Sequence, residues 1–180
     1  MRELFYVAPS KLTAEQIRRV TEVALSHPAE AATIFASSDA EPSVRACTVR
    51  WISDPWIQAL LWPYVKAAND AGFQVDVHER AEIQFVEYSA QDGAHYDWHQ
   101  DVQWYGQTGQ DRKLSVTVQL SKTEDYEGGD LEFEDVQTSA DFRSQGTVLV
   151  FPSYLRHRVH PVTSGIRYAL VAWFFGPRWR

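Results

Sequence analysis

Residues 88–101 read Tyr-Ser-Ala-Gln-Asp-Gly-Ala-His-Tyr-Asp-Trp-His-Gln-Asp, and this stretch ends in an imidazole and a carboxylate two residues apart, His99 and Asp101. On a β-strand, residues i and i+2 point to the same face, with Cα atoms roughly 6.5 Å apart. Two such side chains can converge on one metal ion, and His157 offers a second imidazole downstream. Two histidines and one carboxylate with open coordination positions are the ligand set of a non-haem Fe(II) site. We therefore take these three residues as candidate metal ligands.

The spacing alone leaves rival residues open. His95 and Asp97 have the same separation as His99 and Asp101, and on one continuous strand all four side chains would share a face. His160 follows His157 by three residues, so in a strand the two imidazoles face opposite ways and at most one points inward. Periodicity does not choose between the two His-x-Asp pairs, and it favours His157 over His160 only modestly.

The amino-acid composition restricts the classes of protein to which the chain can belong. The chain has 180 residues, of which 44% are hydrophobic and 13% aromatic, which predicts one globular domain over residues 1–180. The net charge of −7 argues against a nucleic-acid surface. A single cysteine, Cys47, excludes an intramolecular disulfide and a cysteine-based zinc site. The start of the chain lacks a signal-peptide pattern, and the longest apolar run, Tyr168–Phe175, is far shorter than the roughly 20 residues of a membrane span. We expect a soluble, cytoplasmic domain without a membrane partner.

Two helices are predicted in the first part of the chain. Thr13 can cap the first helix, with Gln16 at the third position as in a capping box, and this helix should end near His27-Pro28. Residues 29–43 are expected to form a loop or short helix, and residues 43–52 a strand. Asp54 followed by Pro55 marks a second helix start, which should run to about Gly72.

After Gly72 the pattern changes to short strands. The candidate strands are residues 73–78, 81–88, 96–102, 113–120, 130–134, 147–151, 158–162 and 167–175, and turn signals lie at 91–93, 106–111, 128–129, 144–146 and 164–165. This order predicts an α+β, mainly β fold: a double-stranded β-helix, or jelly roll, over about residues 73–177, supported by N-terminal helices over about residues 11–72.

One predicted strand is polar on one face. Ser115, Thr117 and Gln119 alternate with apolar residues, which is typical of a strand that lines a site or faces solvent. Arg167 opens the last, otherwise apolar strand. A guanidinium is permanently charged and binds a carboxylate through two parallel hydrogen bonds, so Arg167 is either a surface charge or an anchor for an acidic ligand.

Five separated motifs carry a family resemblance. They are Gly93-x-x-Tyr96-x-x-His99-x-Asp101, Arg112-Lys113-Leu114-Ser115, Tyr126-x-Gly128-Gly129-x-Leu131, Phe151-Pro152-Ser153, and His157-x-Val159-x-Pro161-Val162-x-x-Gly165-x-Arg167-Tyr168. Together they resemble the prolyl 4-hydroxylase-type 2-oxoglutarate- and Fe(II)-dependent dioxygenases, the PKHD-type hydroxylases. The resemblance covers roughly residues 80–177, and residues 44–52 are similar to the preceding strand of the family.

The resemblance assigns roles to particular residues. It implies that His99, Asp101 and His157 are the catalytic iron ligands, and that Arg167 grips the C5 carboxylate of 2-oxoglutarate. Tyr88 matches a tyrosine near the cosubstrate, and Gln119 stands where some relatives place a second tyrosine beside the arginine. Further residues expected in the cosubstrate site are Tyr96, Ser115 and Thr117.

The resemblance also implies a reaction. Fe(II), 2-oxoglutarate and O2 would serve to hydroxylate a substrate C–H bond, with a peptidyl proline as the target, succinate and CO2 as by-products, and ascorbate as an additional cofactor. The alternatives are the same chemistry on a free amino acid or small metabolite, or a non-catalytic jelly-roll binding module. Aromatic residues expected at the substrate pocket are Trp98, Trp104 and Tyr105, and residues 102–111 are a candidate lid. The sequence leaves the oligomeric state open.

Overall fold

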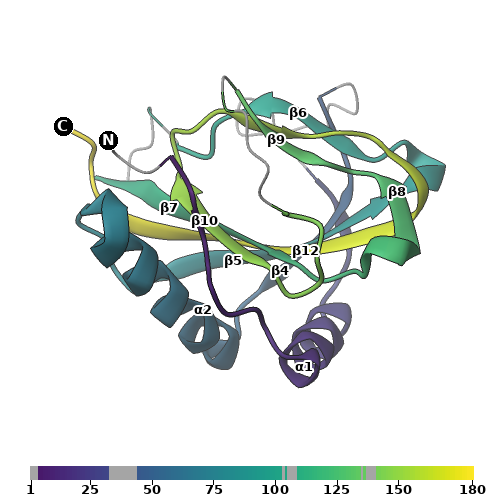
Figure 1. Ribbon diagram of the computed structural model, residues 1–180, viewed down its shortest axis with the longest axis horizontal. Helices are drawn as coiled ribbons and strands as arrows, with labels where there is room; N and C mark the ends of the chain where they lie inside the picture. The colour runs from purple at the N-terminus through teal and green to yellow at the C-terminus, as the bar shows by residue number, and fades with distance from the viewer. Residues whose placement is uncertain (1–3, 33–43, 103, 105–108, 135, 137–140) are drawn as a thin grey trace.

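A computed structural model describes residues 4–32, 44–102, 104, 109–134, 136 and 141–180, and it contains two facing β-sheets with two helices under the larger one (Figure 1). The helices are α1 (Ala14–Leu25) and α2 (Pro55–Ala68). The strands are β1 (Tyr6–Val7), β2 (Glu30–Ala31), β3 (Arg45–Ala46), β4 (Thr48–Ile52), β5 (Ala81–Ser89), β6 (His95–His99), β7 (Gln110–Gln119), β8 (Tyr126–Gly128), β9 (Leu131–Phe133), β10 (Val148–Pro152), β11 (His157–Val159) and β12 (Val162–Pro177).

The two sheets have the topology of a jelly roll. The larger sheet runs β1-β10-β7-β12-β5-β4-β2, and β8 also pairs with β12. The smaller sheet runs β3-β6-β11-β9. Neighbouring strands are antiparallel, and β12 lies between β5 and β7 at the centre of the larger sheet. The predicted fold class, a double-stranded β-helix with supporting helices, is confirmed.

The helices begin where the sequence predicts. The Thr13 hydroxyl accepts from the Gln16 backbone N–H at 3.2 Å, while the Gln16 side chain accepts from the Thr13 backbone N–H at 2.8 Å. Asp54 caps α2 by accepting from the Trp56 backbone N–H at 2.7 Å. Among the described residues, no helix is both long and apolar enough to cross a membrane.

Alternation along β12 separates the core from the site. Leu170, Ala172 and Phe174 are buried on the helix side, in one cluster with Ile57 and Leu61 of α2. The intervening residues, including Arg167, Ala169, Val171 and Trp173, line cavities on the opposite side, between the two sheets. One face of the strand therefore packs in the core, and the other face lines the space between the sheets.

The strand predicted at residues 73–78 is not formed. A short π-helix, Asn69–Phe73, continues α2, and Gln74 then adopts a left-handed conformation with φ of 51°. The Asn69 side chain both accepts from the Val75 backbone N–H, at 2.9 Å, and donates to the Val75 carbonyl, at 3.0 Å. The amide thus takes both backbone groups that a neighbouring strand would need, and the segment remains irregular.

The turn predicted at Ser164-Gly165 lies inside β12. Gly165 has φ of 70°, and a Cβ at this position would lie 2.1 Å from the Asp125 carbonyl oxygen. Glycine therefore lets β12 pass close to the backbone at Asp125 and pair with β8 without ending. Conversely, the strand predicted at 158–162 is split, because β11 ends at Val159 and β12 begins at Val162.

Two further expectations fall partly outside the described residues. These are the loop or short helix at 29–43, of which only 30–31 is seen as β2, and the candidate lid at 102–111, in which residues 103 and 105–108 are not described.

Candidate metal centre

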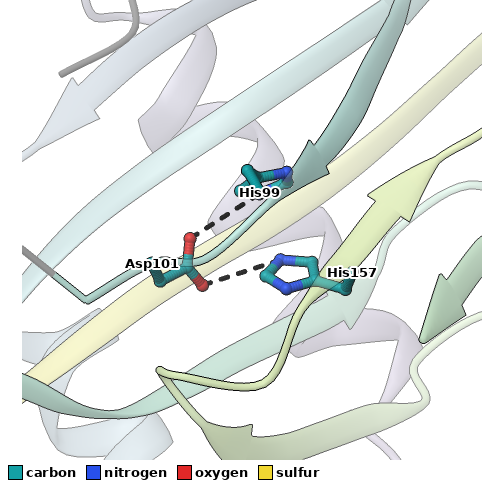
Figure 2. Close-up of side chains that lie close together, drawn as sticks. All are labelled: His99, Asp101 and His157. Atoms are coloured by element: carbon teal, nitrogen blue, oxygen red, sulfur yellow. Dashed lines mark ion pairs between the residues drawn. The ribbon is translucent and has the colours of Figure 1, made fainter. Parts of the chain in front are cut away.

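Three side chains from two strands and a following turn meet between the sheets (Figure 2). His99 ends β6, and His157 is its directly paired residue on β11. Asp101 lies between the two rings: its Oδ1 is 3.7 Å from His99 Nε2 and its Oδ2 is 3.7 Å from His157 Nε2. One candidate ligand atom from each residue lies within 4.8 Å of the others. All three side chains are largely buried, so an ion held here would be shielded from bulk water.

The structure separates this triad from its sequence rivals. Within the described ranges, His99, Asp101 and His157 form the one cluster of three or more such groups that could hold a metal ion. The His95 ring contacts the Gly93 carbonyl, near the start of β6, and Asp97 is exposed. His160 instead pairs with Glu132, its Nε2 lying 2.6 Å from the carboxylate.

Backbone carbonyls set the tautomer of both histidines. The Nδ1 of His99 lies 2.7 Å from the Asp97 carbonyl oxygen, and the Nδ1 of His157 lies 2.9 Å from that of Leu155. A carbonyl oxygen only accepts, so each Nδ1 carries the proton and donates it. In the neutral imidazole this leaves the lone pair on Nε2, on the side of Asp101, and this is the form in which imidazole binds a metal ion.

Charges at the triad are also suited to a cation. Burial, with the neighbouring His157, lowers the pKa of His99 to about 3, so its ring is neutral at pH 7. Burial alone would raise the pKa of Asp101, but the two histidines, the Ser115 hydroxyl and Arg112 together hold that pKa below its usual value. The Ser115 hydroxyl donates to Asp101 Oδ2 at 2.7 Å and lies 3.0 Å from the Ser153 hydroxyl. The site therefore offers a neutral His99 imidazole and an ionised Asp101 carboxylate beside the ring of His157.

An aromatic stack fixes the plane of the His99 ring. The Tyr96 ring lies nearly parallel to it, with centroids 3.4 Å apart and an interplanar angle of 10°. The Arg45 guanidinium carbon lies 4.5 Å from the centroid of the same tyrosine ring. Burial raises the pKa of Tyr96 to about 12, so its hydroxyl stays protonated. Tyr96 therefore acts as a rigid support for a candidate ligand.

Arg167 shares a cavity with the triad. A space of about 40 Å³ is lined by all three candidate ligands together with Tyr88, Thr117 and Arg167. A second cavity, of about 240 Å³, adjoins it and is also lined by Thr117 and Arg167. Arg167 is 5% exposed, so this cation is held in the interior at the junction of the two cavities.

Hydrogen bonds through Gln119 to Tyr126 orient the guanidinium of Arg167. Its Nε donates to Gln119 Oε1 at 3.1 Å, and the Gln119 amide nitrogen donates to the Tyr126 hydroxyl at 3.0 Å. Tyr88 is the paired residue of Arg167 across β5 and β12, and its ring centroid is 5.4 Å from the guanidinium carbon. Gly129 has φ of 65°, and a Cβ there would lie 2.9 Å from Val162 Cγ2 and 3.0 Å from Arg167 Cδ, so glycine leaves room for the arginine side chain. Sequence reasoning did not assign a role to Tyr126, although it lies in a motif with Gly129.

The predicted substrate residues lie elsewhere or outside the described part. Trp98 lies under Arg158, whose guanidinium carbon is 4.6 Å from the ring centroid, and it lines neither cavity around the triad. Trp104 is half exposed, and its indole nitrogen donates to Gln100 at 3.4 Å without reaching these cavities. Tyr105 lies outside the described residues.

A family model described as the 2OG-Fe(II) oxygenase superfamily matches residues 83–175, just over half of the chain. The chain belongs to this superfamily. The matched segment contains every one of the three candidate ligands as well as Arg167.

Named relatives match parts of this oxygenase chain. A PKHD-type hydroxylase of Idiomarina loihiensis is 39% identical over 84 residues, which are 46% of this chain and 38% of that protein. A PKHD-type hydroxylase of Gloeothece citriformis is 35% identical over 122 residues, 65% of this chain and 54% of that protein. The aligned part of the oxygenase chain thus spans about two fifths to one half of the length of these curated relatives.

Solved structures of oxygenases share the fold. A Pseudomonas putida prolyl-4-hydroxylase has a TM-score of 0.74 at 19% identity, covering 97% of this chain and 93% of the other. The viral collagen prolyl hydroxylase of Paramecium Bursaria Chlorella virus-1, in a 2OG complex, has a TM-score of 0.70 at 15% identity, covering 97% of each chain. The carbocyclase SnoK from nogalamycin biosynthesis has a TM-score of 0.68 at 13% identity, covering 97% and 81%. At such identities the similarity establishes the architecture alone, and it spans oxygenases of more than one reaction.

Proposed function

We propose that the chain is an Fe(II)- and 2-oxoglutarate-dependent dioxygenase that hydroxylates a C–H bond of a peptidyl proline and releases succinate and CO2. The observation that carries this proposal is the meeting of His99, Asp101 and His157 in a cavity that Arg167 also lines. Membership of the 2OG-Fe(II) oxygenase superfamily supports the same reaction class.

The triad fits a ferrous ion. His99 and His157 would bind it through Nε2, because each Nδ1 is committed to a backbone carbonyl, and Asp101 would supply an oxygen. The Ser115 hydroxyl donates to the Asp101 carboxylate and keeps it oriented for this role. Three protein ligands leave coordination positions for cosubstrate and O2. Bound Fe(II) and 2-oxoglutarate would supply the oxidising chemistry, and the protein residues bind, orient and exclude water.

Arg167 fits the distal carboxylate of a dicarboxylate cosubstrate. Its Nε is bound to Gln119, so the guanidinium edge with the two terminal nitrogens is the part available for a paired interaction with a carboxylate. Thr117, like Arg167, lines both cavities, and its hydroxyl would add a polar group to their lining. Burial raises the pKa of Tyr88, so its hydroxyl remains a neutral donor beside Arg167.

The choice of proline as target follows the named relatives. The P. putida and viral structures are named prolyl hydroxylases, and a Trichoplax adhaerens prolyl hydroxylase was solved with a peptide fragment. The other sequence predictions remain part of this proposal: one domain over residues 1–180, a cytoplasmic location, no nucleic-acid or membrane partner, and ascorbate as an additional cofactor.

Anaerobic addition of Fe(II) and 2-oxoglutarate tests the proposal directly. The complex should give a weak visible charge-transfer band in the wild-type protein and in His95→Ala, whose side chain lies outside the triad. A folded protein without this band would favour the non-catalytic binding module.

The substrate is tested separately under air. Proline-containing peptides and free L-proline are incubated with the loaded enzyme, and mass spectrometry follows the gain of one oxygen atom while succinate is quantified. Hydroxylation of a peptide identifies the proposed class, and hydroxylation of the free amino acid alone would replace it with the small-metabolite alternative.

A further inference from the structure

The turn at residues 152–155, between β10 and β11, holds the backbone of one candidate ligand. The Ser153 carbonyl accepts from the backbone N–H of Asp101 at 2.9 Å and from that of Val102 at 3.0 Å. The Ser153 hydroxyl lies 3.0 Å from that of Ser115, the residue that donates to the Asp101 carboxylate. Ser153 is fully buried, so this part of the turn is fixed in the interior and sets where Asp101 lies.

The same turn also reaches both candidate histidines. The Leu155 carbonyl accepts the Nδ1 proton of His157 at 2.9 Å. The Tyr154 carbonyl accepts from the side-chain nitrogen of Gln100 at 2.6 Å, and Gln100 directly follows His99 in the chain. The positions of all three candidate ligands therefore depend on four consecutive residues.

The outer surface of this turn is the side chain of Tyr154, which packs against Trp179. The two rings meet edge to face, with centroids 5.0 Å apart and an interplanar angle of 74°. This is a preferred geometry for a pair of aromatic rings, and it restrains both partners. Tyr154 is still 37% exposed, so the contact with Trp179 limits how far the turn can move outward.

Trp179 is in turn attached to β7. Its backbone N–H donates to Asp111 Oδ2 at 2.8 Å, and its indole Nε1–H donates to the Arg112 carbonyl at 3.3 Å. The Lys113 ammonium lies 3.7 Å from the centroid of the indole ring. The Lys113 carbonyl accepts from the Ser153 N–H at 3.0 Å. Trp179 therefore joins the long strand β7 to the turn that holds the ligands.

Trp179 lines neither of the two cavities that contain Arg167, so any effect on the metal centre must pass through other residues. We propose that Trp179 is a positioning residue of the metal centre, and that it acts through Tyr154 on the turn at residues 152–155. The inference rests on the proposed function, because it concerns the residues that would bind Fe(II).

Amide hydrogen exchange of the metal-free protein tests the connection from Trp179 to Asp101. In Trp179→Ala, exchange at the Asp101 and Val102 amides, which both donate to Ser153, should accelerate about tenfold more than at the Leu170 amide in the core, the upper range for one lost aromatic pair. Equal acceleration at all three amides would mean a global loss of stability and would overturn the inference. Unchanged exchange at Asp101 and Val102 would do the same.

Titration of the metal-free protein with Co(II), followed by visible absorption, measures the metal centre without turnover. Trp179→Ala should weaken Co(II) binding about tenfold, the lower end of the range for residues that orient metal ligands. Trp179→Phe keeps an aromatic ring beside Tyr154 and should bind Co(II) within about twofold of the wild-type protein. An unchanged Co(II) affinity in Trp179→Ala would contradict the positioning role.

A double-variant cycle tests whether Trp179 acts through Tyr154. Tyr154→Leu should weaken Co(II) binding by about the same factor as Trp179→Ala, and the combined variant should bind no more weakly than either one. If the two factors multiply instead, Trp179 acts by a route that avoids Tyr154, and the inference is wrong.

Trp62→Ala is the matched control for the loss of a large aromatic side chain. Trp62 packs on Phe174 at the helix side of the larger sheet. This variant should lower the free energy of unfolding without weakening Co(II) binding. A loss of Co(II) affinity equal to that in Trp179→Ala would show that general destabilisation explains both, and would overturn the inference.

The two proposals fail differently. A folded wild-type protein that binds neither Co(II) nor Fe(II) would defeat the proposed function and the positioning role together. A wild-type protein that shows the anaerobic Fe(II)–2-oxoglutarate band, combined with an unchanged Co(II) affinity in Trp179→Ala, would defeat the positioning role alone.

Discussion

The two sheets of this molecule differ in how they are built and in what they carry. The larger sheet contains β12 of 16 residues and β7 of 10, and two helices pack against its outer side (Figure 1). The smaller sheet has strands of two to five residues, and its outer side carries ion pairs such as Arg158 with Glu132. Arg167 and Trp173 lie on the larger sheet, whereas His99 and His157 lie on the smaller one.

The main hydrophobic cluster and the residues that could bind a metal ion therefore lie largely in different layers. The main hydrophobic cluster lies on the face of the larger sheet that packs against the helices. His99 and His157 lie on short strands of the smaller sheet, on the other side of the larger sheet. Substitutions in one layer should therefore change one property and leave the other nearly intact.

The largest effect is expected at the ligands. His99→Ala or Asp101→Ala should abolish Fe(II) binding and activity while the protein remains folded, because the core cluster does not include either residue. Metal content after anaerobic loading, together with circular dichroism, measures this. Full activity in either variant would defeat the ligand assignment, and His95→Ala should retain iron.

A core substitution should have the opposite pattern. Leu170 is fully buried on the helix side of β12, so Leu170→Ala should lower the free energy of unfolding by about 2–5 kcal/mol. Urea unfolding measures the loss, and iron binding should persist under conditions where the variant is folded. Leu131→Ala on β9 is the comparison in the smaller sheet and should cost less, because Leu131 is only partly buried.

Arg167→Ala should raise the KM for 2-oxoglutarate by roughly 10–100-fold, the effect of losing hydrogen bonds to a charged group. Succinate formation as a function of 2-oxoglutarate concentration gives this value. Arg158→Ala, which removes a guanidinium from the outer side of the smaller sheet, should leave the KM unchanged. An unchanged KM in Arg167→Ala would remove that residue from the cosubstrate site.

The smallest effect is expected at Gln119, which accepts a hydrogen bond from the Arg167 guanidinium. Gln119→Leu removes the acceptor of Arg167 Nε and should raise the same KM by about fivefold, since one hydrogen bond of orientation is lost. Gln58→Leu on α2 is a matched change on the other side of the sheet. Equal effects of the two variants would mean that Gln119 acts through stability and not through Arg167.

Local patterns in the sequence were sufficient for most of the jelly-roll strands and for the two helix starts. Thr13 and Asp54 cap as predicted because capping depends on residues within one turn. The strand predicted at 73–78 was wrong, since alternating Val75 and Val77 suggest a strand while the Asn69 side chain occupies the backbone of Val75. A side-chain contact of this kind is invisible to periodicity.

The site required information that local pattern does not contain. Choosing His99 over His95 depended on family motifs, and the structure brings together the residues that those motifs select. Trp173 and Tyr126 acquire their neighbours only through the register of strands far apart in the chain, such as β5 with β12. The tautomers depend on carbonyl groups, which every residue has and which no side-chain motif reveals.

The use of carbonyl oxygens at Asp97 and Leu155 to hold both imidazole rings has an evolutionary consequence. Main-chain groups survive amino-acid replacement, so mutations at these two positions leave the orientation of the rings unaffected as long as the local backbone path persists. The side chains around the two candidate ligands can therefore change while the orientation of both rings is retained.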